Sequence, residues 1–238
     1  MRRPFSLSPR LQAVANLVPA STRLVDVGTD HGRLPVWLVQ HGGIANAVAT
    51  DLRSGPLSSG QALAQRWNVS DRISFRLCDG LSLVTSAEAE TITITGMGGE
   101  TIVDILSAAP WVLDCDRCFI FQAMSGMDAL RRYLSDTGFI IERELLVPEG
   151  DTLYVVILAK PGQMEPLTLG EIWVGRQKQG MDAPLRGRYL DQELQKLHRA
   201  ISGLLRSERP VDAEKLGHYQ AAAREVTQIK EEWDQWQL

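Results

Sequence analysis

Strand-like and helix-like segments alternate through the first half of the chain, and this alternation limits the possible folds more than any other feature. Short apolar runs rich in β-branched residues occur at residues 23–27, 44–50, 73–78, 91–95 and 118–122. Helical patterns lie between them, one with Pro35 in its first turn and another from Leu57 to Asn68. Such alternation indicates parallel crossovers, so we expect a parallel sheet with helices on both faces.

The alternation changes near Gly138. Residues 139–147 and 154–159 are two further strand patterns, separated only by the turn-like segment from Pro148 to Thr152. A connection this short cannot hold a parallel crossover, so the two strands must pair antiparallel as a hairpin at the sheet edge. The sequence therefore predicts an α/β fold of Rossmann-like type with a mixed seven-stranded sheet.

The last third of the chain has a different pattern, which begins after a linker marked by Pro161, Gly162 and Pro166. Leucines and other apolar residues then recur at spacings of three and four on either side of Arg209 and Pro210. This spacing predicts two long amphipathic helices that form an antiparallel helical hairpin, a short coiled coil. We expect two domains, residues 1–162 and 163–238.

The first strand ends in Asp26-Val27-Gly28-Thr29-Asp30-His31-Gly32. A glycine at such a strand-to-helix turn lets a ligand approach the backbone, and the helix N-terminus adds free N–H groups. A sharp bend without any ligand explains the glycine equally well. The third glycine of the dinucleotide-binding motif is missing, which disfavours a nicotinamide cofactor.

Two carboxylates at neighbouring strand ends narrow the choice. Asp51 ends the second strand and is placed to accept hydrogen bonds from both hydroxyls of a ribose, a feature that dehydrogenases share. Asp79 ends the third strand, where it can accept from the amino group of an adenine. Together with the turn at Gly28 and the antiparallel hairpin, these residues favour a methyltransferase over a dehydrogenase.

The sequence resembles the class I methyltransferases that use S-adenosylmethionine, and within them the TrmK family of bacterial tRNA adenine-N1 methyltransferases. The segments that carry the resemblance are residues 24–35, Gly55-Pro56-Leu57, Cys78-Asp79-Gly80-Leu81 and Gly96-Met97-Gly98-Gly99. It covers residues 1 to about 160. One departure is Gly32-Arg33, because family members often have a small residue and an aromatic residue there.

The resemblance implies S-adenosylmethionine as cofactor, tRNA as partner, and methylation of N1 of an adenine in the D-arm, at position 22. It also implies a set of residues that bind the cofactor: Asp26, Gly28, Asp30, Gly32, Asp51, Leu52, Asp79, Gly80, Gly96 and Met97. Gly28 is expected near the methionine end of the cofactor, Asp51 at the ribose and Asp79 at the adenine.

The segment Gly96-Met97-Gly98-Gly99 has none of the polar groups that enzymes methylating an exocyclic amine usually present after the fourth strand. Adenine N1 already has an available lone pair, so positioning is expected to supply most of the acceleration. Methylation makes the ring cationic, and a carboxylate beside it can stabilise that charge or accept a proton. We expect Asp30 to be this catalytic group, with His31 beside it; the alternative is that Asp30 caps the following helix and His31 only packs structurally.

Composition sets outer limits on partners and location. The net charge of −4 argues against nucleic-acid binding over the whole surface, although Arg2, Arg3, Arg10 and several basic residues after position 175 permit a local RNA-binding surface. No apolar run approaches the roughly 20 residues that cross a bilayer, so we expect a cytoplasmic protein without membrane contact. Cys115 and Cys118 form a lone CxxC motif, from which we expect no metal site.

Two alternatives remain open from the residues alone. In one, the chain methylates a small molecule or a protein, and the helical hairpin serves only for dimerisation. In the other, it is a non-catalytic module that binds RNA or protein. We expect a monomer or a weak homodimer.

Overall fold

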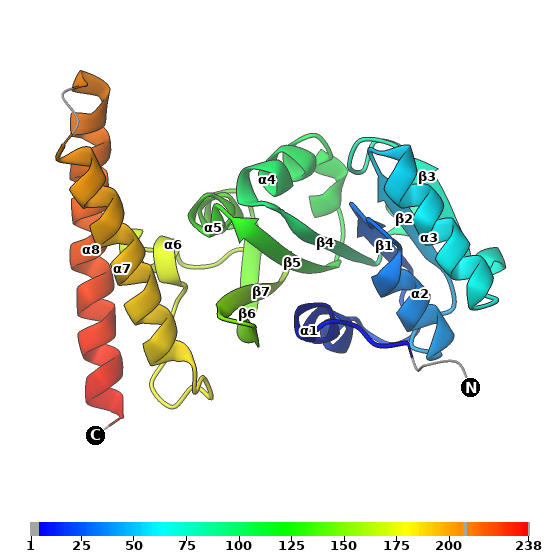
Figure 1. Cartoon of the computed structure of the whole chain (residues 1–238), viewed down its shortest axis with the longest axis horizontal. Coiled ribbons are helices and arrows are strands. Elements are labelled where there is room, and N and C mark those ends of the chain that lie inside the picture. Colours follow the sequence, from blue (N-terminus) through cyan, green and yellow to red (C-terminus); the bar gives the residue numbers. More distant parts are fainter. Residues whose placement is uncertain (1–4, 207–208, 238) are drawn as a thin grey trace.

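Seven strands form one mixed sheet in the computed structural model, which describes residues 5–206 and 209–237 (Figure 1). Arg2 and Arg3 lie outside the described residues. The strands are β1 (Leu24–Val27), β2 (Ala47–Asp51), β3 (Ile73–Leu77), β4 (Thr91–Gly98), β5 (Cys118–Ser125), β6 (Phe139–Glu149) and β7 (Thr152–Pro161). Their order across the sheet is β3-β2-β1-β4-β5-β7-β6.

The pairing confirms the prediction of a parallel sheet closed by an antiparallel hairpin. β1 to β5 pair in parallel, whereas β7 runs antiparallel to both β5 and β6. The chain order reverses between β1 and β4, and the crevice outside the carboxyl ends of strands at such a point is where ligands bind in open α/β sheets.

The sequence placed the segment from Gly96 to Gly99 after the end of the fourth strand, but the structure makes most of it part of that strand. β4 continues to Gly98 and pairs with β5 through Met97 and Gly98, with two register shifts on the way. The glycines permit this irregular path because they lack a Cβ. The segment is therefore the bulged end of a central strand, held on one side by β5.

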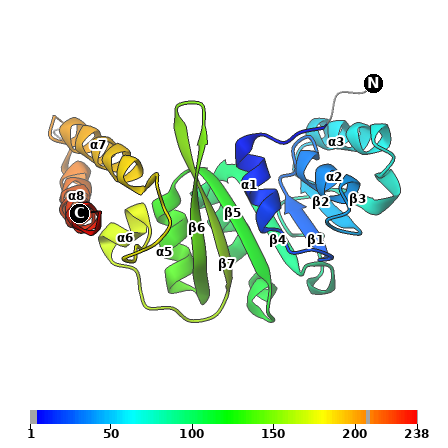
Figure 2. The same ribbon diagram turned by 90° about the horizontal axis from the view of Figure 1, so that it is seen from below.

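Helices cover both faces of the sheet (Figure 2). They are α1 (Pro9–Leu17), α2 (Arg33–Gln40), α3 (Ser54–Arg66), α4 (Gly99–Ser107), α5 (Met127–Asp136), α6 (Leu169–Val174), α7 (Arg186–Leu204) and α8 (Pro210–Trp236), with 3₁₀ turns at Ser70–Arg72, Ser86–Glu88 and Pro110–Leu113. No prediction was made for α1, α5 and α6. Of these, α6 has only six residues, too few turns for an apolar periodicity to stand out.

Two hydrophobic clusters pack against the sheet. One cluster joins α1, α2 and α3, with Val14, Val36 and Ala64 fully buried. The other lies under α4 and α5 and extends without a break to Leu190 and Ala222 in α7 and α8. The C-terminal helices thus share a core with one side of the sheet, and a domain boundary between residues 162 and 163, in the loop that follows β7, stays a prediction.

The predicted helical hairpin is present in α7 and α8, which lie side by side (Figure 1). α8 begins at Pro210, as the sequence indicated. A third helix, α6, packs on α8, where a Cβ on Gly170 would lie 2.8 Å from the Cβ of Glu225. The backbone N–H of Gly170 donates to the Glu225 carboxylate.

A buried arginine joins this helical part to the sheet. Arg131 of α5 has no exposed surface, and its Nε and Nη2 donate to the two carboxylate oxygens of Glu144 on β6 at 2.9 and 2.8 Å. Its Nη1 donates to the carbonyl of Trp173 at the end of α6, and Nη2 also reaches the hydroxyl of Tyr189 on α7. One side chain therefore contacts β6, α6 and α7 together.

Arg186, which the sequence placed among the basic residues available to RNA, is also buried. It donates to the carbonyls of Val174 and Gly175. Burial lowers the pKa of Arg186 to about 10. This side chain closes the end of α6 and does not belong to an RNA-binding surface. Among the described helices, none combines the length and apolar character of a membrane span.

Candidate active site

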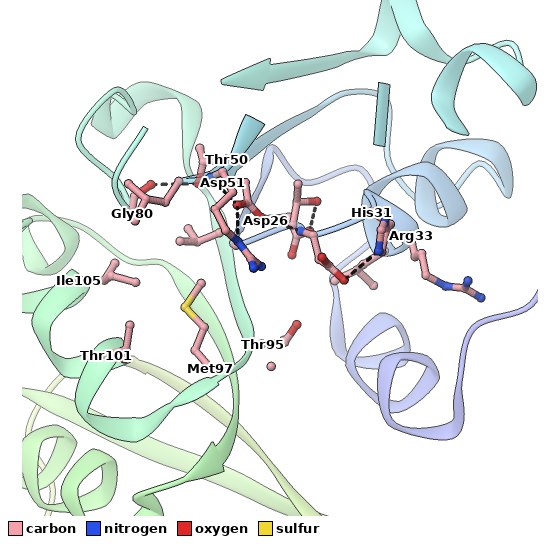
Figure 3. Close-up of a pocket in the computed structure, with 18 of the residues that line it drawn as sticks. Asp26, His31, Arg33, Thr50, Asp51, Gly80, Thr95, Met97, Thr101 and Ile105 are labelled. Carbon is pink, nitrogen blue, oxygen red and sulfur yellow. Dashed lines mark hydrogen bonds and ion pairs between the residues drawn. The ribbon is translucent and has the colours of Figure 1, made fainter. Parts of the chain in front are cut away.

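A cavity of about 500 Å³ opens at the carboxyl ends of the parallel strands, at the point where the strand order reverses (Figure 3). Its size is within the usual range for small-molecule sites, roughly 300–1,000 Å³. The residues that line it come from the ends of β1 to β5, the turn before α2, and helices α1, α2 and α4. It therefore lies where the sequence placed the ligand.

The turn after β1 is held by a buried carboxylate. Asp26 is 3% exposed, and its two oxygens accept hydrogen bonds from the hydroxyls of Thr29 at 2.6 Å and Thr93 at 2.7 Å. Burial raises the pKa of Asp26 to about 6, against the two hydrogen bonds, which lower it; the Asp51 charge adds a smaller rise. Asp26 lines the cavity, but its oxygens face the protein and set the shape of the turn.

This raised pKa predicts a pH-dependent contribution to stability. In the unfolded chain Asp26 titrates near 3.8 and in the folded protein near 6, so the unfolded state loses its proton first as the pH rises. Its contribution to the free energy of unfolding therefore falls between pH 4 and pH 6, by about 3 kcal/mol for this shift. We expect Asp26→Asn, which cannot titrate, to lack that fall in urea unfolding measured from pH 4 to pH 7. A constant difference between the two proteins would contradict the assignment, and Asp71→Asn, at an exposed position, is the control.

Asp51 is oriented by backbone groups. Its side chain is 6% exposed; Oδ2 accepts from the backbone N–H of Asp30 at 3.0 Å, and Oδ1 accepts from that of Arg53 at 2.9 Å. A carboxylate oxygen can accept a second hydrogen bond, so both oxygens remain able to bind hydroxyl groups of a ligand. Asp51 thus links the turn after β1 to the end of β2.

Asp79 lies at the end of the neighbouring strand, exposed and in the same cavity. Leu52 and Gly80 line the cavity beside it. Gly80 has φ +51°, and a Cβ there would lie 2.9 Å from a methyl carbon of Ile105. Gly80 and Ile105 are therefore in close contact, and together they form an apolar part of the cavity wall beside Asp79.

Gly28 and Met97 both line the cavity and lie in contact with each other. Gly28 has φ +65°, and a Cβ at this position would come 1.9 Å from the terminal methyl carbon of Met97. A glycine is needed on both counts: L side chains disfavour this φ, and the space is already filled. Met97 therefore sets how closely a ligand approaches the turn.

This contact predicts the effect of Gly28→Ala. The new methyl displaces the flexible end of Met97 into the cavity, and we expect the affinity for S-adenosylmethionine, measured by calorimetry, to fall roughly tenfold or more. Gly42→Ala is a matched control because Gly42 has φ +73° and open space around the added Cβ. The double variant Gly28→Ala with Met97→Ala is expected to recover part of the affinity. Equal losses in Gly28→Ala and Gly42→Ala would show that steric filling is not the cause.

Asp30 and His31 both line the cavity, and Figure 3 shows His31 across the cavity from Met97. Their side chains are 60% and 57% exposed, and the nearest carboxylate oxygen lies 3.7 Å from His31 Nε2. The alternative in which Asp30 caps the following helix is wrong: the N-cap of α2 is Gly32, and no side chain caps it. Asp30 instead adopts φ +53° and leaves its carboxylate at the cavity.

The structure brings nearly all of the predicted site residues to one cavity. Gly32 is the exception: it is buried behind the turn, and a Cβ there would lie 3.0 Å from Gly60 Cα and 3.2 Å from the Phe75 ring. Lining residues without a predicted role in the site include Arg10, Thr95, Thr101 and Met124. The only sequence signal for any of them was the place of Arg10 among the N-terminal arginines.

The residues present fit S-adenosylmethionine, the cofactor that the resemblance implies. Asp51 and Asp79 line the same cavity, as binding of the ribose by one and of the adenine by the other requires. Gly80 and Ile105 offer an apolar surface for the adenine ring beside Asp79, and Gly28 lines the cavity at the turn where the amino-acid end is expected. Among the described residues, no group of three or more His, Cys, Asp or Glu side chains is arranged to hold a metal ion.

Comparison with known proteins identifies the family. A family model described as a methyltransferase domain matches residues 7–157. A tRNA (adenine(22)-N(1))-methyltransferase of Bacillus subtilis (strain 168) is 31% identical over 161 residues, covering 68% of each chain.

Two solved structures were obtained with a bound cofactor or its product. A putative tRNA (m1A22) methyltransferase of Streptococcus pneumoniae in complex with S-adenosyl-L-methionine is 30% identical, with a TM-score of 0.76 over 92% of this chain and 100% of that one. TrmK of M. capricolum with S-adenosyl-homocysteine is 25% identical, with a TM-score of 0.77 over 94% of this chain and 98% of that one. These matches and the cavity together show that the chain belongs to the methyltransferases and, among them, to the TrmK family of tRNA (adenine(22)-N(1))-methyltransferases.

Proposed function

We propose that this protein transfers the methyl group of S-adenosylmethionine to N1 of an adenine in the D-arm of tRNA, at position 22. The observation that carries the proposal is the single cavity in which Asp51, Asp79 and Gly28 meet, in a chain of this family. When bound, the cofactor supplies a methyl group made electrophilic by its sulfonium. The remaining requirement is to hold adenine N1 in line with that methyl group.

The protein's residues divide the cavity between cofactor and target. Asp51 accepts hydrogen bonds from the ribose hydroxyls, and Asp79 accepts from the adenine amino group of the cofactor. Both lie on the side of β2 and β3. The target adenine enters on the side of β4, beside Thr95 and the bulged segment at Gly96. Holding the two reactants in line supplies most of the acceleration, because N1 needs no activating base.

Asp30 compensates the charge that the reaction creates. Methylation at N1 leaves a positive charge on the adenine ring, and the Asp30 carboxylate faces the cavity in which the ring is methylated. A fixed carboxylate stabilises the developing charge and can accept the N6 proton afterwards. His31, 3.7 Å from this carboxylate, is positioned to take part in the proton transfer.

This role predicts the behaviour of Asp30→Asn. Asparagine tolerates the left-handed backbone conformation of Asp30, and the backbone N–H that binds Asp51 is unchanged. We expect kcat to fall roughly 10²-fold, while the Kd for S-adenosylmethionine changes less than about twofold. Single-turnover kinetics and calorimetry measure the two. An unchanged kcat would show that Asp30 takes no part in the reaction. A larger loss of kcat in His31→Gln than in Asp30→Asn would show that His31 has this role instead.

Binding of tRNA is proposed to extend from the cavity to the C-terminal helices. Exposed basic side chains there include Lys178, Arg188, Arg199 and Arg206, while the neighbouring Arg176 and Lys196 are engaged in ion pairs with Glu171 and Glu193. A few phosphate contacts along this edge fit a protein of net negative charge. We further propose that the enzyme works in the cytoplasm, as a monomer or weak homodimer.

The proposed reaction is tested with transcribed tRNA and radiolabelled cofactor. We expect methyl incorporation into tRNA with adenine at position 22 and none when that adenine is replaced by guanine. Digestion and mass spectrometry of the product should show 1-methyladenosine. Unchanged incorporation into the guanine variant would overturn the site, and N6-methyladenosine as product would overturn the reaction.

A further inference from the structure

Arg10 reaches the cavity from an element outside the alternating strand-helix pattern. It lies in the first turn of α1, which packs against β5, β6 and β7 (Figure 2). Its guanidinium lines the cavity beside Gly96, where a Cβ would lie 3.7 Å from Nη1. Arg10 therefore stands at the end of β4, on the side away from Asp51 and Asp79.

Several contacts fix the guanidinium in this place. Nη1 donates to Oε1 of Gln122 at 2.5 Å and to the sulfur of Met124 at 3.4 Å. The guanidinium carbon lies 5.2 Å from the centroid of the Tyr154 ring, within the range of a cation–π contact. Gln122 is fully buried, and its own amide donates to the carbonyl of Ala123. The side chain is thus anchored from two strands, β5 and β7.

These anchors are neutral, so the positive charge of Arg10 is not compensated by contact. None of the ion pairs among residues 5–206 and 209–237 includes Arg10, and its buried Nε finds no acceptor among them. The carboxylate of Glu149 accepts a hydrogen bond from the backbone N–H of Arg10, and this bond is the largest cause of the lowered pKa of Glu149. The charge of Arg10 is the smallest cause. An arginine held rigidly with free donors is a binding site for an oxyanion.

We propose that Arg10 binds a phosphate of the target nucleotide and thereby positions the adenine; this inference rests on the proposed function. The cofactor side of the cavity is on β2 and β3, whereas the anchors of Arg10 are on β5 and β7, beyond the target side. A guanidinium next to the methylated, cationic ring would repel it. The backbone phosphate, one sugar away from the base, is the anionic group of the target that this position suits.

Arg10→Met and Arg10→Lys test the proposal against Arg23→Met. Arg23 precedes β1 at the opposite end of the sheet, and its side chain is 60% exposed and pairs with Glu90 on the surface, so its loss should be neutral. We expect Arg10→Met to raise the KM for tRNA roughly tenfold or more, and to lower the slope of log affinity against log salt by about 1. The Kd for S-adenosyl-homocysteine should stay within about twofold, which also shows that the fold is intact. Arg10→Lys, a point charge without the planar fork, should recover part of the loss.

A chemical change in the RNA identifies the anion. tRNA is assembled by ligation with one neutral methylphosphonate linkage, placed either 5′ or 3′ of the target adenosine. At one of the two positions, the neutral linkage should weaken binding of the wild-type enzyme and of Arg23→Met but leave Arg10→Met unaffected. Equal losses in all three proteins at both positions would overturn the proposal.

Two other outcomes also overturn it and can be told apart from failure of the proposed function. If Arg10→Met loses affinity for S-adenosyl-homocysteine and keeps its affinity for tRNA, the anion is the carboxylate of the cofactor. If Arg10→Met behaves like Arg23→Met in every assay, Arg10 binds no anion. In both cases wild-type methylation of tRNA remains intact, whereas a wild-type enzyme inactive on tRNA would contradict the proposed function itself.

Discussion

Replacement of Asp51 by alanine is expected to weaken binding of S-adenosylmethionine roughly a thousandfold, because a carboxylate contributes about 1.5–3 kcal/mol for each hydrogen bond to a ligand hydroxyl. The variant loses its contacts to both ribose hydroxyls. It also leaves the backbone N–H groups of Asp30 and Arg53 without their acceptor, so the turn that shapes the cavity loosens. Calorimetry with S-adenosylmethionine and S-adenosyl-homocysteine measures the change.

Asp79→Ala and Asp71→Ala complete this comparison. Asp79 is exposed, and its carboxylate accepts no hydrogen bond among the described residues, so its loss should cost only the adenine contact, about tenfold. Asp71 lies in the 3₁₀ turn before β3, away from the cavity, and its replacement should leave affinity unchanged. An Asp51→Ala protein that binds within about fivefold of wild type would contradict the assignment of Asp51 to the ribose.

Replacement of Arg131 by methionine is expected to lower the free energy of unfolding by about 3–5 kcal/mol, the usual cost of removing one partner of a buried ion pair. Glu144 would keep its charge with only 17% of its side chain exposed, and the carbonyl of Trp173 would lose its donor. Burial alone lowers the pKa of Arg131, but Glu144 and Tyr189 together raise it, so the guanidinium remains charged at any working pH. Urea unfolding followed by circular dichroism measures the loss.

Arg132→Met is the matched control, because Arg132 is the next residue of α5 and is exposed. It should change stability by less than about 0.5 kcal/mol. Adding Glu144→Gln to Arg131→Met should cost less than the sum of the two single losses, since the residues form one pair. A loss below about 1 kcal/mol in Arg131→Met would show that Arg131 does not hold α6 and α7 to the sheet.

The family resemblance and the strand pattern together anticipated most of the site. Residues that follow parallel strands come to the same edge of the sheet, so Asp51 and Asp79 were expected to meet, and both line one cavity. The sequence alone explained Gly28 equally well by a sharp bend that binds no ligand. The contact between its missing Cβ and Met97 now shows why glycine is required there. Gly32 was grouped with the cofactor residues because of its place in the motif, but it packs against Gly60 and Phe75.

The sequence by itself determined the succession of the seven strands along the chain, the antiparallel hairpin and the paired C-terminal helices, since each follows from local periodicity and the length of a connection. Only the tertiary structure decided that α1 brings Arg10 to the cavity, that β4 continues through Met97 beside β5, and that Arg131 is buried while Arg132 is exposed. Local patterns record which residues share a face of one element. Which face of which other element they meet depends on packing between segments far apart in the chain, and no spacing within a short window contains that information.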